Sequence, residues 1–141
     1  MFKKILVPLD GSLLSEAALA PAIDLAKHYN AEIELAIISL IPTLYHVIDE
    51  NVLKADLESC RVYIERAAAM VRDAGVPATT HVGEGAPAVA RAIVRRAEAG
   101  SADVIVLSSH GQGSVERLVL GSVAERVSHM SRVPVLLIHP H

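Results

Sequence analysis

The chain has 141 residues, of which 52% are hydrophobic and 3% aromatic, and its formal net charge is −3. This length suits a single domain over 1–141 with a full core, while scarce aromatic side chains and a negative charge argue against binding to nucleic acids or anionic membranes. No apolar run approaches the length of a membrane span and the first residues lack a signal-peptide core, so we expect a cytoplasmic protein.

The chain alternates between the two hydrophobic periods that mark strands and helices. Short continuous apolar runs predict strands, and apolar residues three and four positions apart predict helices that bury one face. Because strands and helices alternate, we expect a parallel sheet with right-handed crossovers. In chain order we predict a strand over 2–7, a helix from Ser12 or Ser15, a strand over 32–40, a long helix with an apolar face from Leu53 to Val71, a strand through 81–82, a helix with an apolar stripe over 89–97, a strand over 104–107, a helix over 122–131 and a strand over 133–138.

Prolines and glycines set the expected boundaries of these elements. We expect Pro8 to end the first strand, and Pro21 to kink the first helix or to mark a later start, because an interior proline costs about 3 kcal/mol. Gly75 is expected just past the end of the long helix. Residues 83–85 are predicted to turn the chain into the next helix, with Pro87 near its first turn.

The segment after the fourth predicted strand has the sequence pattern of a phosphate-binding loop. Gly111 and Gly113 allow the backbone to turn successive N–H groups toward one point, where they can hold an anion. Ser122 followed by Glu125 predicts a capping box at the start of the next helix. The segment is not a P-loop, because no lysine follows Gly121. A tight strand-to-helix connection, with glycines only for turning, is the alternative interpretation.

Two loops that are distant in the sequence are expected to meet. If the first and fourth strands are the central pair, the loop over 8–12 faces the glycine loop, and both are rich in turn-making polar residues. Open parallel sheets bind ligands outside the carboxyl ends of the strands, where the winding direction reverses. A nucleotide fits this arrangement.

Both loops resemble those of the universal stress protein family. The resemblance is carried by Ile5-Leu-Val-Pro-Leu-Asp10-Gly-Ser12 and by Ser108-Ser-His-Gly111, nine residues, then Gly121-Ser122-Val-Ala-Glu125. It covers essentially the whole chain and implies an α/β fold of the Rossmann-like, adenine nucleotide alpha hydrolase-like type. That fold is a three-layer α/β/α sandwich around an open five-stranded parallel sheet of order 3-2-1-4-5. The resemblance also implies ATP or ADP as the ligand.

The resemblance also assigns residues to the parts of the nucleotide. The ATP-binding branch has glycine, two residues, glycine, nine residues, glycine and then Ser or Thr, and Ser108 stands here in place of the first glycine. A side chain therefore lies where backbone would approach the ribose or phosphates. The implied contacts are Pro8 and Leu9 lining the base pocket, Asp10 on adenine or ribose, Ile38 against adenine, Leu107 and Ser108 on the ribose side, and Gly111, Gly113, Gly121, Ser122 and Val123 on the phosphates, with a charge from Arg117.

Some of these residues also have a purely structural interpretation. Asp10 before Gly-Ser is a strong turn signal, so it could simply stabilise the turn or cap the first helix. Ile38 belongs to a strand core in any case. A lone loop histidine such as His110 is expected to be solvated, and Cys60, at helical spacing with Leu57 and Ile64, is expected to be a packed thiol.

The sequence favours a regulator over an enzyme. No catalytic lysine is visible in the loop, Glu116 is its only acid, and the seven histidines show no metal-binding spacing. We therefore expect no catalytic residues and no metal site. The expected protein is an ATP-binding regulator of the stress response that acts through protein partners, with Mg²⁺ carried by the phosphates and at most slow hydrolysis. The alternative is the same fold without nucleotide, acting only through protein contacts.

The last strand predicts how the protein assembles. Residues 133–138 are apolar on both faces, and an edge strand of this kind leaves N–H and C=O groups open for pairing. A two-fold homodimer through this strand would cover them, as the resemblance also implies. A second apolar stretch, 41–48, is expected to be the entry to the long helix; the alternatives are a flap over the pocket or a mobile surface.

Overall fold

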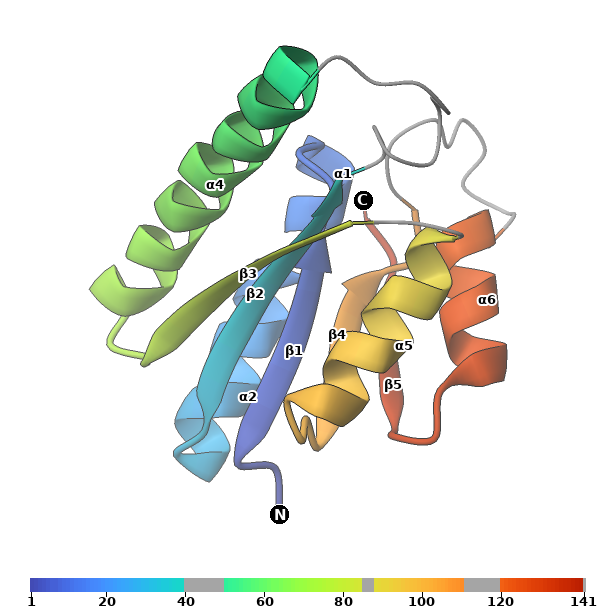
Figure 1. The fold of residues 1–141 in the computed structure, drawn as a ribbon. Helices are drawn as coiled ribbons and strands as arrows, with labels where there is room; N and C mark the ends of the chain where they lie inside the picture. Colours follow the sequence, from blue (N-terminus) through green and yellow to red (C-terminus); the bar gives the residue numbers. More distant parts are fainter. Residues whose placement is uncertain (40–49, 85–87, 111–119, 141) are drawn as a thin grey trace.

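The computed structural model describes residues 1–39, 50–84, 88–110 and 120–140. Five strands and five helices follow one another within these ranges (Figure 1). They are β1 (Lys4–Leu9), α1 (Leu13–Glu16), α2 (Leu19–Tyr29), β2 (Glu32–Ser39), α4 (Glu50–Asp73), β3 (Ala78–Glu84), α5 (Val89–Ala99), β4 (Val104–Ser108), α6 (Ser122–Met130) and β5 (Val135–Ile138).

The sheet has the predicted order and direction. Its strands run β3-β2-β1-β4-β5, and every pairing is parallel. The winding direction reverses at β1, which pairs with β2 on one side and with β4 on the other. The predicted three-layer α/β/α sandwich with order 3-2-1-4-5 is therefore confirmed. Its reversal point is where an open parallel sheet binds ligands.

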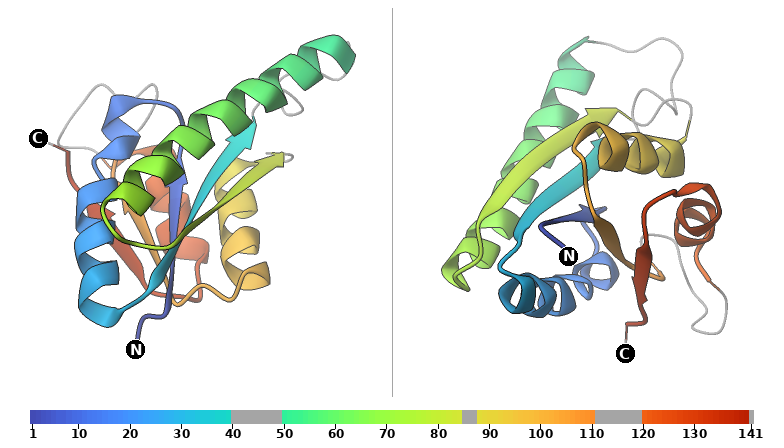
Figure 2. Two further views of the ribbon diagram at one scale, coloured as in Figure 1. Left: turned by 90° about the vertical axis from the view of Figure 1, so that its left-hand side faces the viewer. Right: turned by 90° about the horizontal axis from the view of Figure 1, so that it is seen from below.

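Helices cover both faces of the sheet (Figures 1 and 2). One core lies between the sheet and the helices α2 and α4, and it includes Ile5 and Val7 from β1. The other lies between the sheet and the helices α5 and α6, and it includes Leu6. Successive β1 residues thus enter opposite cores, which explains why this strand is a continuous apolar run rather than an alternating one.

Two predicted strand ends were wrong, one placed at a proline and the other at a glycine. Pro8 lies inside β1, in register with Ala36 of β2, and does not end the strand. A proline is tolerated near the end of a strand, where few ladder hydrogen bonds remain to lose. Gly83 and Glu84 belong to β3, in register with Ile38 and Ser39, so the predicted turn does not begin at residue 83. Gly85 and Pro87 lie outside the described residues.

The first helical segment is split in two. Ser12 caps α1, because its side-chain oxygen accepts a hydrogen bond from the Ser15 N–H at 3.1 Å. A separate helix, α2, starts at Leu19, and Pro21 is its third residue. The N–H of that position has no intrahelical partner in any helix, so proline costs little there. The predicted later start is thus the alternative that the structure adopts.

The long helix ends as predicted, and β5 starts two residues late. Gly75 follows α4 with φ +92°, a conformation that glycine adopts without strain. β5 begins at Val135 rather than at residue 133. The segment 41–48 lies outside the described residues, so its three expected roles stay predictions. Leu40, the predicted end of the second strand, also lies outside them.

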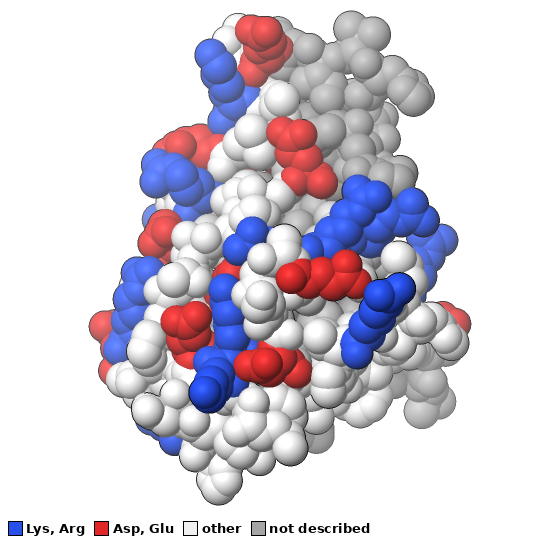
Figure 3. Space-filling model, turned by 60° about the horizontal axis from the view of Figure 1, so that its bottom comes forward, with Lys and Arg blue, Asp and Glu red and all other residues white. Residues whose placement is uncertain are grey.

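Charged side chains are mixed on the surface. Figure 3 shows positive and negative groups interspersed on the face that it presents, rather than gathered by sign. The Glu34 carboxylate is buried: its side chain is 4% exposed, and it forms ion pairs with Lys4 and Arg96. Over the described part of the chain, no helix combines the length and apolar character needed to cross a membrane.

Candidate functional site

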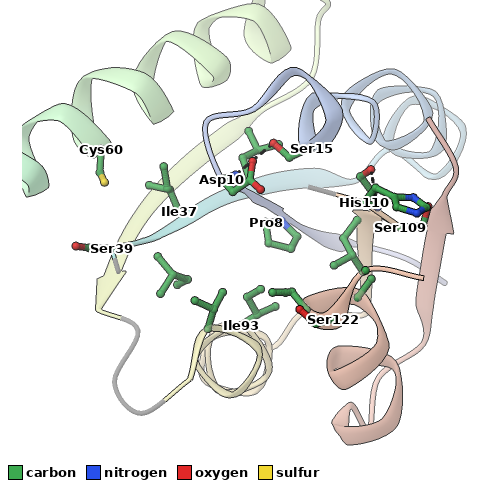
Figure 4. A pocket seen from close by; sticks show the side chains of 18 of the residues that line it. Pro8, Asp10, Ser15, Ile37, Ser39, Cys60, Ile93, Ser109, His110 and Ser122 are labelled. Carbon is green, nitrogen blue, oxygen red and sulfur yellow. Dashed lines mark hydrogen bonds between the residues drawn. The ribbon is translucent and has the colours of Figure 1, made fainter. Parts of the chain in front are cut away.

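A cavity of about 410 Å³ opens at the carboxyl ends of β1, β2 and β4, within the usual range of about 300–1,000 Å³ for ligand pockets (Figure 4). Segments distant in the sequence meet there, including the β1 loop, the start of α6 and the side of α4. The lining residues are Pro8, Leu9, Asp10, Ser15, Ile37, Ile38, Ser39, Asp56, Cys60, Val89, Ile93, Leu107, Ser108, Ser109, His110, Gly121, Ser122, Val123 and Ala124.

The middle of the cavity is apolar. Pro8, Ile37 and Ile93 are set around it in Figure 4, on β1, β2 and α5 respectively. Ile38 neighbours Ile37 on β2 and belongs to the α5 side of the sheet. Aliphatic walls from three different elements can enclose a flat hydrophobic group, such as a nucleobase, and exclude water from it.

The N-terminus of α6 forms one end of the cavity. Gly121 is the N-cap, with φ −61° and ψ 148°, and no side chain caps the helix. The predicted capping box is therefore wrong: Ser122 is the first helical residue, and Glu125 lies one position too far along to reach back. The N–H groups of Ser122, Val123 and Ala124 have no intrahelical acceptor, and with the helix dipole they favour an anion.

The β1 loop is held by its own side chains. The Asp10 Oδ1 atom accepts hydrogen bonds from the Ser12 N–H at 2.9 Å and from the Ser12 hydroxyl at 2.6 Å. Asp10 thus has the turn-stabilising role that its sequence context indicated. Its side chain is also exposed and lines the cavity near Ser15, so a ligand hydroxyl can reach the carboxylate.

A polar cluster lies where β4 ends. The Ser109 Oγ atom is 2.9 Å from Nδ1 of His110 and 2.9 Å from Nδ1 of His139. The Ser108 hydroxyl, at the position where the family usually has glycine, accepts a hydrogen bond from the His110 N–H at 3.3 Å. His110 is only 7% exposed, so the expectation that it is solvated was wrong.

The opposite end of the cavity is also polar. The Ser39 hydroxyl donates a short hydrogen bond to the Asp56 Oδ2 atom, and the Cys60 thiol lies 3.9 Å from the same oxygen. Burial raises the pKa of Cys60, and the nearby Asp56 carboxylate raises it further, so the thiol stays protonated near neutral pH. Cys60 is half-buried against the core, as expected of a packed thiol, and it also faces the cavity.

The cavity gathers most of the residues that the sequence singled out. Gly111, Gly113 and Arg117 lie outside the described residues, so their predicted phosphate contacts stay predictions. Among the described residues, no group of three or more His, Cys, Asp or Glu side chains is arranged to hold a metal ion. The predicted residues that line the cavity are Pro8, Leu9, Asp10, Ile38, Leu107, Ser108, Gly121, Ser122 and Val123.

The polar end near α4 was not predicted from the sequence. Ser39 ends an apolar strand, and Asp56 lies within the apolar stripe of α4, between Leu53 and Cys60 at helical spacing. A carboxylate within such a stripe was the available signal, because charged residues are rarely placed on a core-facing surface without a partner.

Comparison with known proteins identifies the family. The profile of the universal stress protein family matches residues 1–139. Universal stress protein MJ0531 of Methanocaldococcus jannaschii is 34% identical, with 98% of this chain and 82% of that protein covered. Universal stress protein YxiE of Bacillus subtilis is also 34% identical, with 98% and 99% covered.

Solved structures share the same architecture. The structure of MJ0577 from M. jannaschii has a TM-score of 0.83 at 29% identity and covers 100% of this chain and 98% of its own. Two more distant structures show the same fold in complexes: a universal stress protein with cAMP, at TM-score 0.65 and 24% identity, and one from Archaeoglobus fulgidus with dAMP, at 0.70 and 20%. They cover 99% and 98% of this chain, and 98% of their own chains. With the sequence motifs, the sheet order and the family profile in agreement, this chain belongs to the universal stress protein family.

Proposed function

We propose that the protein is a nucleotide-binding regulator and that its cavity holds ATP or ADP. One observation carries the proposal: an uncapped helix N-terminus and an aliphatic wall face the same cavity at the reversal point of the sheet. The helix end suits phosphates, the wall suits a base, and Asp10 between them suits the hydroxyls of a ribose. The complexes of distant family members with cAMP and dAMP support a nucleotide as the ligand class.

The proposal assigns no catalytic residue. Phosphoryl transfer requires groups that orient water and neutralise charge beside the phosphates. Among the described lining residues, the carboxylates are Asp10 and Asp56, and each accepts a hydrogen bond from a neighbouring serine, Ser12 and Ser39 respectively. Mg²⁺ would enter with the phosphates. Occupancy of the site, rather than turnover, would then be the signal that a protein partner detects in the stress response.

The proposed function includes an oligomeric state and a location in the cell. β5 is an edge strand that pairs only with β4 among the described strands, which leaves its outer edge available to a second copy. A homodimer through this edge and a cytoplasmic location are parts of the proposed function. The same fold acting through protein contacts alone is the competing function.

Nucleotide binding can be tested on the purified protein. Chromatography of the small molecules released on denaturation should show about one ATP or ADP per chain, and calorimetry should show ATP binding after their removal. A Gly121→Val variant should lose both signals and keep its fold, because valine accepts a φ of −61° but its side chain would enter the phosphate end. Met130→Val, on the same helix but absent from the cavity lining, is the matched control.

Cys60 provides an independent readout. It is the only cysteine in the chain, and it lines the cavity. A thiol reagent should therefore modify the free protein at one position, and saturating ATP should slow the reaction. Absence of released nucleotide, of a calorimetric signal and of protection in a folded protein would exclude nucleotide binding and leave the competing function.

A further inference from the structure

We propose that Asp56, held in place by Ser39, determines which base the cavity accepts. Its carboxylate would take a hydrogen bond from the exocyclic amine of adenine, at the end of the cavity remote from α6. This inference rests on the proposed function and adds to it a specificity-determining residue on α4.

The polar and apolar groups of the cavity follow one another in a fixed order along it. In Figure 4, Ser122 lies at one end, Asp10 and Pro8 lie midway, and Ser39 and Cys60 lie at the other end beyond Ile37. A nucleotide with its phosphates on the α6 N-terminus therefore has its ribose near Asp10 and its base between the aliphatic side chains. The edge of the base farthest from the ribose points to the cluster of Ser39, Asp56 and Cys60.

Asp56 is held by a hydrogen bond to one of its two carboxylate oxygens. Its Oδ2 atom accepts the Ser39 hydroxyl and has the Cys60 thiol 3.9 Å away, whereas no described residue donates to Oδ1. Ser39 is 2% exposed, so its hydroxyl is a fixed donor. A carboxylate has about four acceptor positions, so Asp56 can accept a ligand donor at the cavity wall while it holds the Ser39 hydroxyl.

The two ends of the cavity differ in their electrostatic character. The Asp56 carboxylate lies 3.9 Å from the Cys60 thiol and, after burial, is a cause of the raised pKa of that thiol. A negative charge at this end repels phosphate, while the α6 N-terminus attracts it. The two ends of the cavity therefore define a single direction for the bound nucleotide.

Purine bases differ in the group that they would present to Asp56. Adenine carries an amine donor where hypoxanthine and guanine carry a carbonyl acceptor. The adenine amine can donate to the Asp56 carboxylate, whereas a carbonyl oxygen at the same position would be repelled by it. The cluster therefore favours a base with an amine at this position.

The test compares two nucleotides and three variants. ATP and purine riboside 5′-triphosphate, which lacks only the exocyclic amine, are titrated calorimetrically into each protein. The wild type should bind ATP about 10-fold more tightly, the scale of a hydrogen bond to a charged group. Asp56→Ala should bind the two equally, and Ser39→Ala should show a smaller preference than the wild type because the carboxylate is no longer held. Asp73→Ala, an exposed change on the same helix, should behave as wild type.

The outcomes separate this inference from the function on which it rests. Equal binding of both nucleotides by the wild type, or an unchanged preference in Asp56→Ala, overturns the role of Asp56 while leaving nucleotide binding intact. If the folded wild type binds neither nucleotide, the proposed function fails, and the base selection fails with it.

Discussion

Ser109 connects two histidines, and the Oγ atom of Ser109 lies 2.9 Å from Nδ1 of His139, a residue just beyond β5. The same Oγ atom lies 2.9 Å from Nδ1 of His110. A hydroxyl has one hydrogen to donate, so when both imidazoles are neutral, one Nδ1 accepts and the other donates. The backbone of Ser109 also bonds Ile138 and Gly121, which joins the ends of β4 and β5 to the start of α6.

Replacing Ser109 with alanine should therefore destabilise the protein. The change removes a hydroxyl that lies 2.9 Å from Nδ1 of His110 and 2.9 Å from Nδ1 of His139, and it opens a small void at a fully buried position. We expect a loss of about 1–3 kcal/mol in the free energy of unfolding, measured by urea titration. Ser128→Ala, on the exposed side of α6, should change it by less than about 0.5 kcal/mol. Equal effects of the two changes would mean that the contacts of the Ser109 hydroxyl with the two histidines contribute nothing to the free energy of unfolding.

The buried Glu34 carboxylate should make stability fall in acid. Burial alone would raise the pKa of Glu34, but hydrogen bonds and charges from Arg96 and Lys4 outweigh burial and hold the pKa below its ordinary value of 4.5. A depressed folded-state pKa stabilises the protein above the unfolded pKa, and this contribution is lost as the pH falls through the folded value. The loss should thus start near pH 4.5 and continue below it.

Urea titrations from pH 7 to pH 3 check this prediction. Glu34→Gln should cost about 3 kcal/mol at pH 7, near the lower limit for breaking a buried pair, because Arg96 and Lys4 retain some contact with water. The variant should also show a shallower decline below pH 4.5 than the wild type. Glu32→Gln, an exposed neighbour on β2, is the control. Parallel pH profiles for wild type and Glu34→Gln would contradict the assignment.

The fold was predictable because its signals are local and repeated. Each strand is an apolar run, each helix has an apolar face, and alternation of the two dictates parallel pairing with crossovers. Pro8 shows where this reasoning fails. Proline usually ends a strand, but whether a missing N–H matters depends on which neighbour would have accepted it, and the neighbours of β1 are distant in the sequence.

The candidate site was predictable on one side only. The ligand contacts assigned from the motifs fall at strand ends and in glycine-rich turns, and those of them that the structure describes line the cavity. Asp56 and Ser39 come from a helix side and a strand end that carry no motif, and their meeting depends on how α4 packs over β2. The position of the α6 cap was also missed, because Gly121 and Ser122 both suit an N-cap and only the backbone conformation selects between them.

Gly83→Ala should weaken ATP binding in the cavity and have little effect on the stability of the fold. A Cβ atom at this position would lie 2.9 Å from the Cδ1 atom of Ile38, the end of a flexible side chain that can move. Ile38 lines the cavity, so its displacement should weaken ATP binding several-fold, while the stability should stay within about 1 kcal/mol of wild type.

A second glycine gives the control for this change. A Cβ at Gly100 would lie 3.2 Å from the Arg96 carbonyl oxygen and 3.3 Å from a Glu34 oxygen, and Gly100 is not among the residues that line the cavity. Gly100→Ala should therefore alter stability and leave ATP affinity unchanged, as measured by urea titration and calorimetry. If Gly100→Ala weakened ATP binding and Gly83→Ala did not, Ile38 would not be part of the aliphatic wall that encloses the base.

Leu136→Asp should convert the proposed homodimer to monomers. Leu136 is 41% exposed on β5, whose outer edge pairs with no described strand, so a dimer across that edge would bring Leu136 close to its symmetry mate. Two carboxylates near the axis would repel each other and would lose hydration on association. Sedimentation or light scattering should give a dimer for the wild type and a monomer for the variant. Met70→Asp, at an exposed position on α4, should remain dimeric. A monomeric wild type would remove the dimer from the proposal, whereas a dimeric Leu136→Asp would place the interface away from β5.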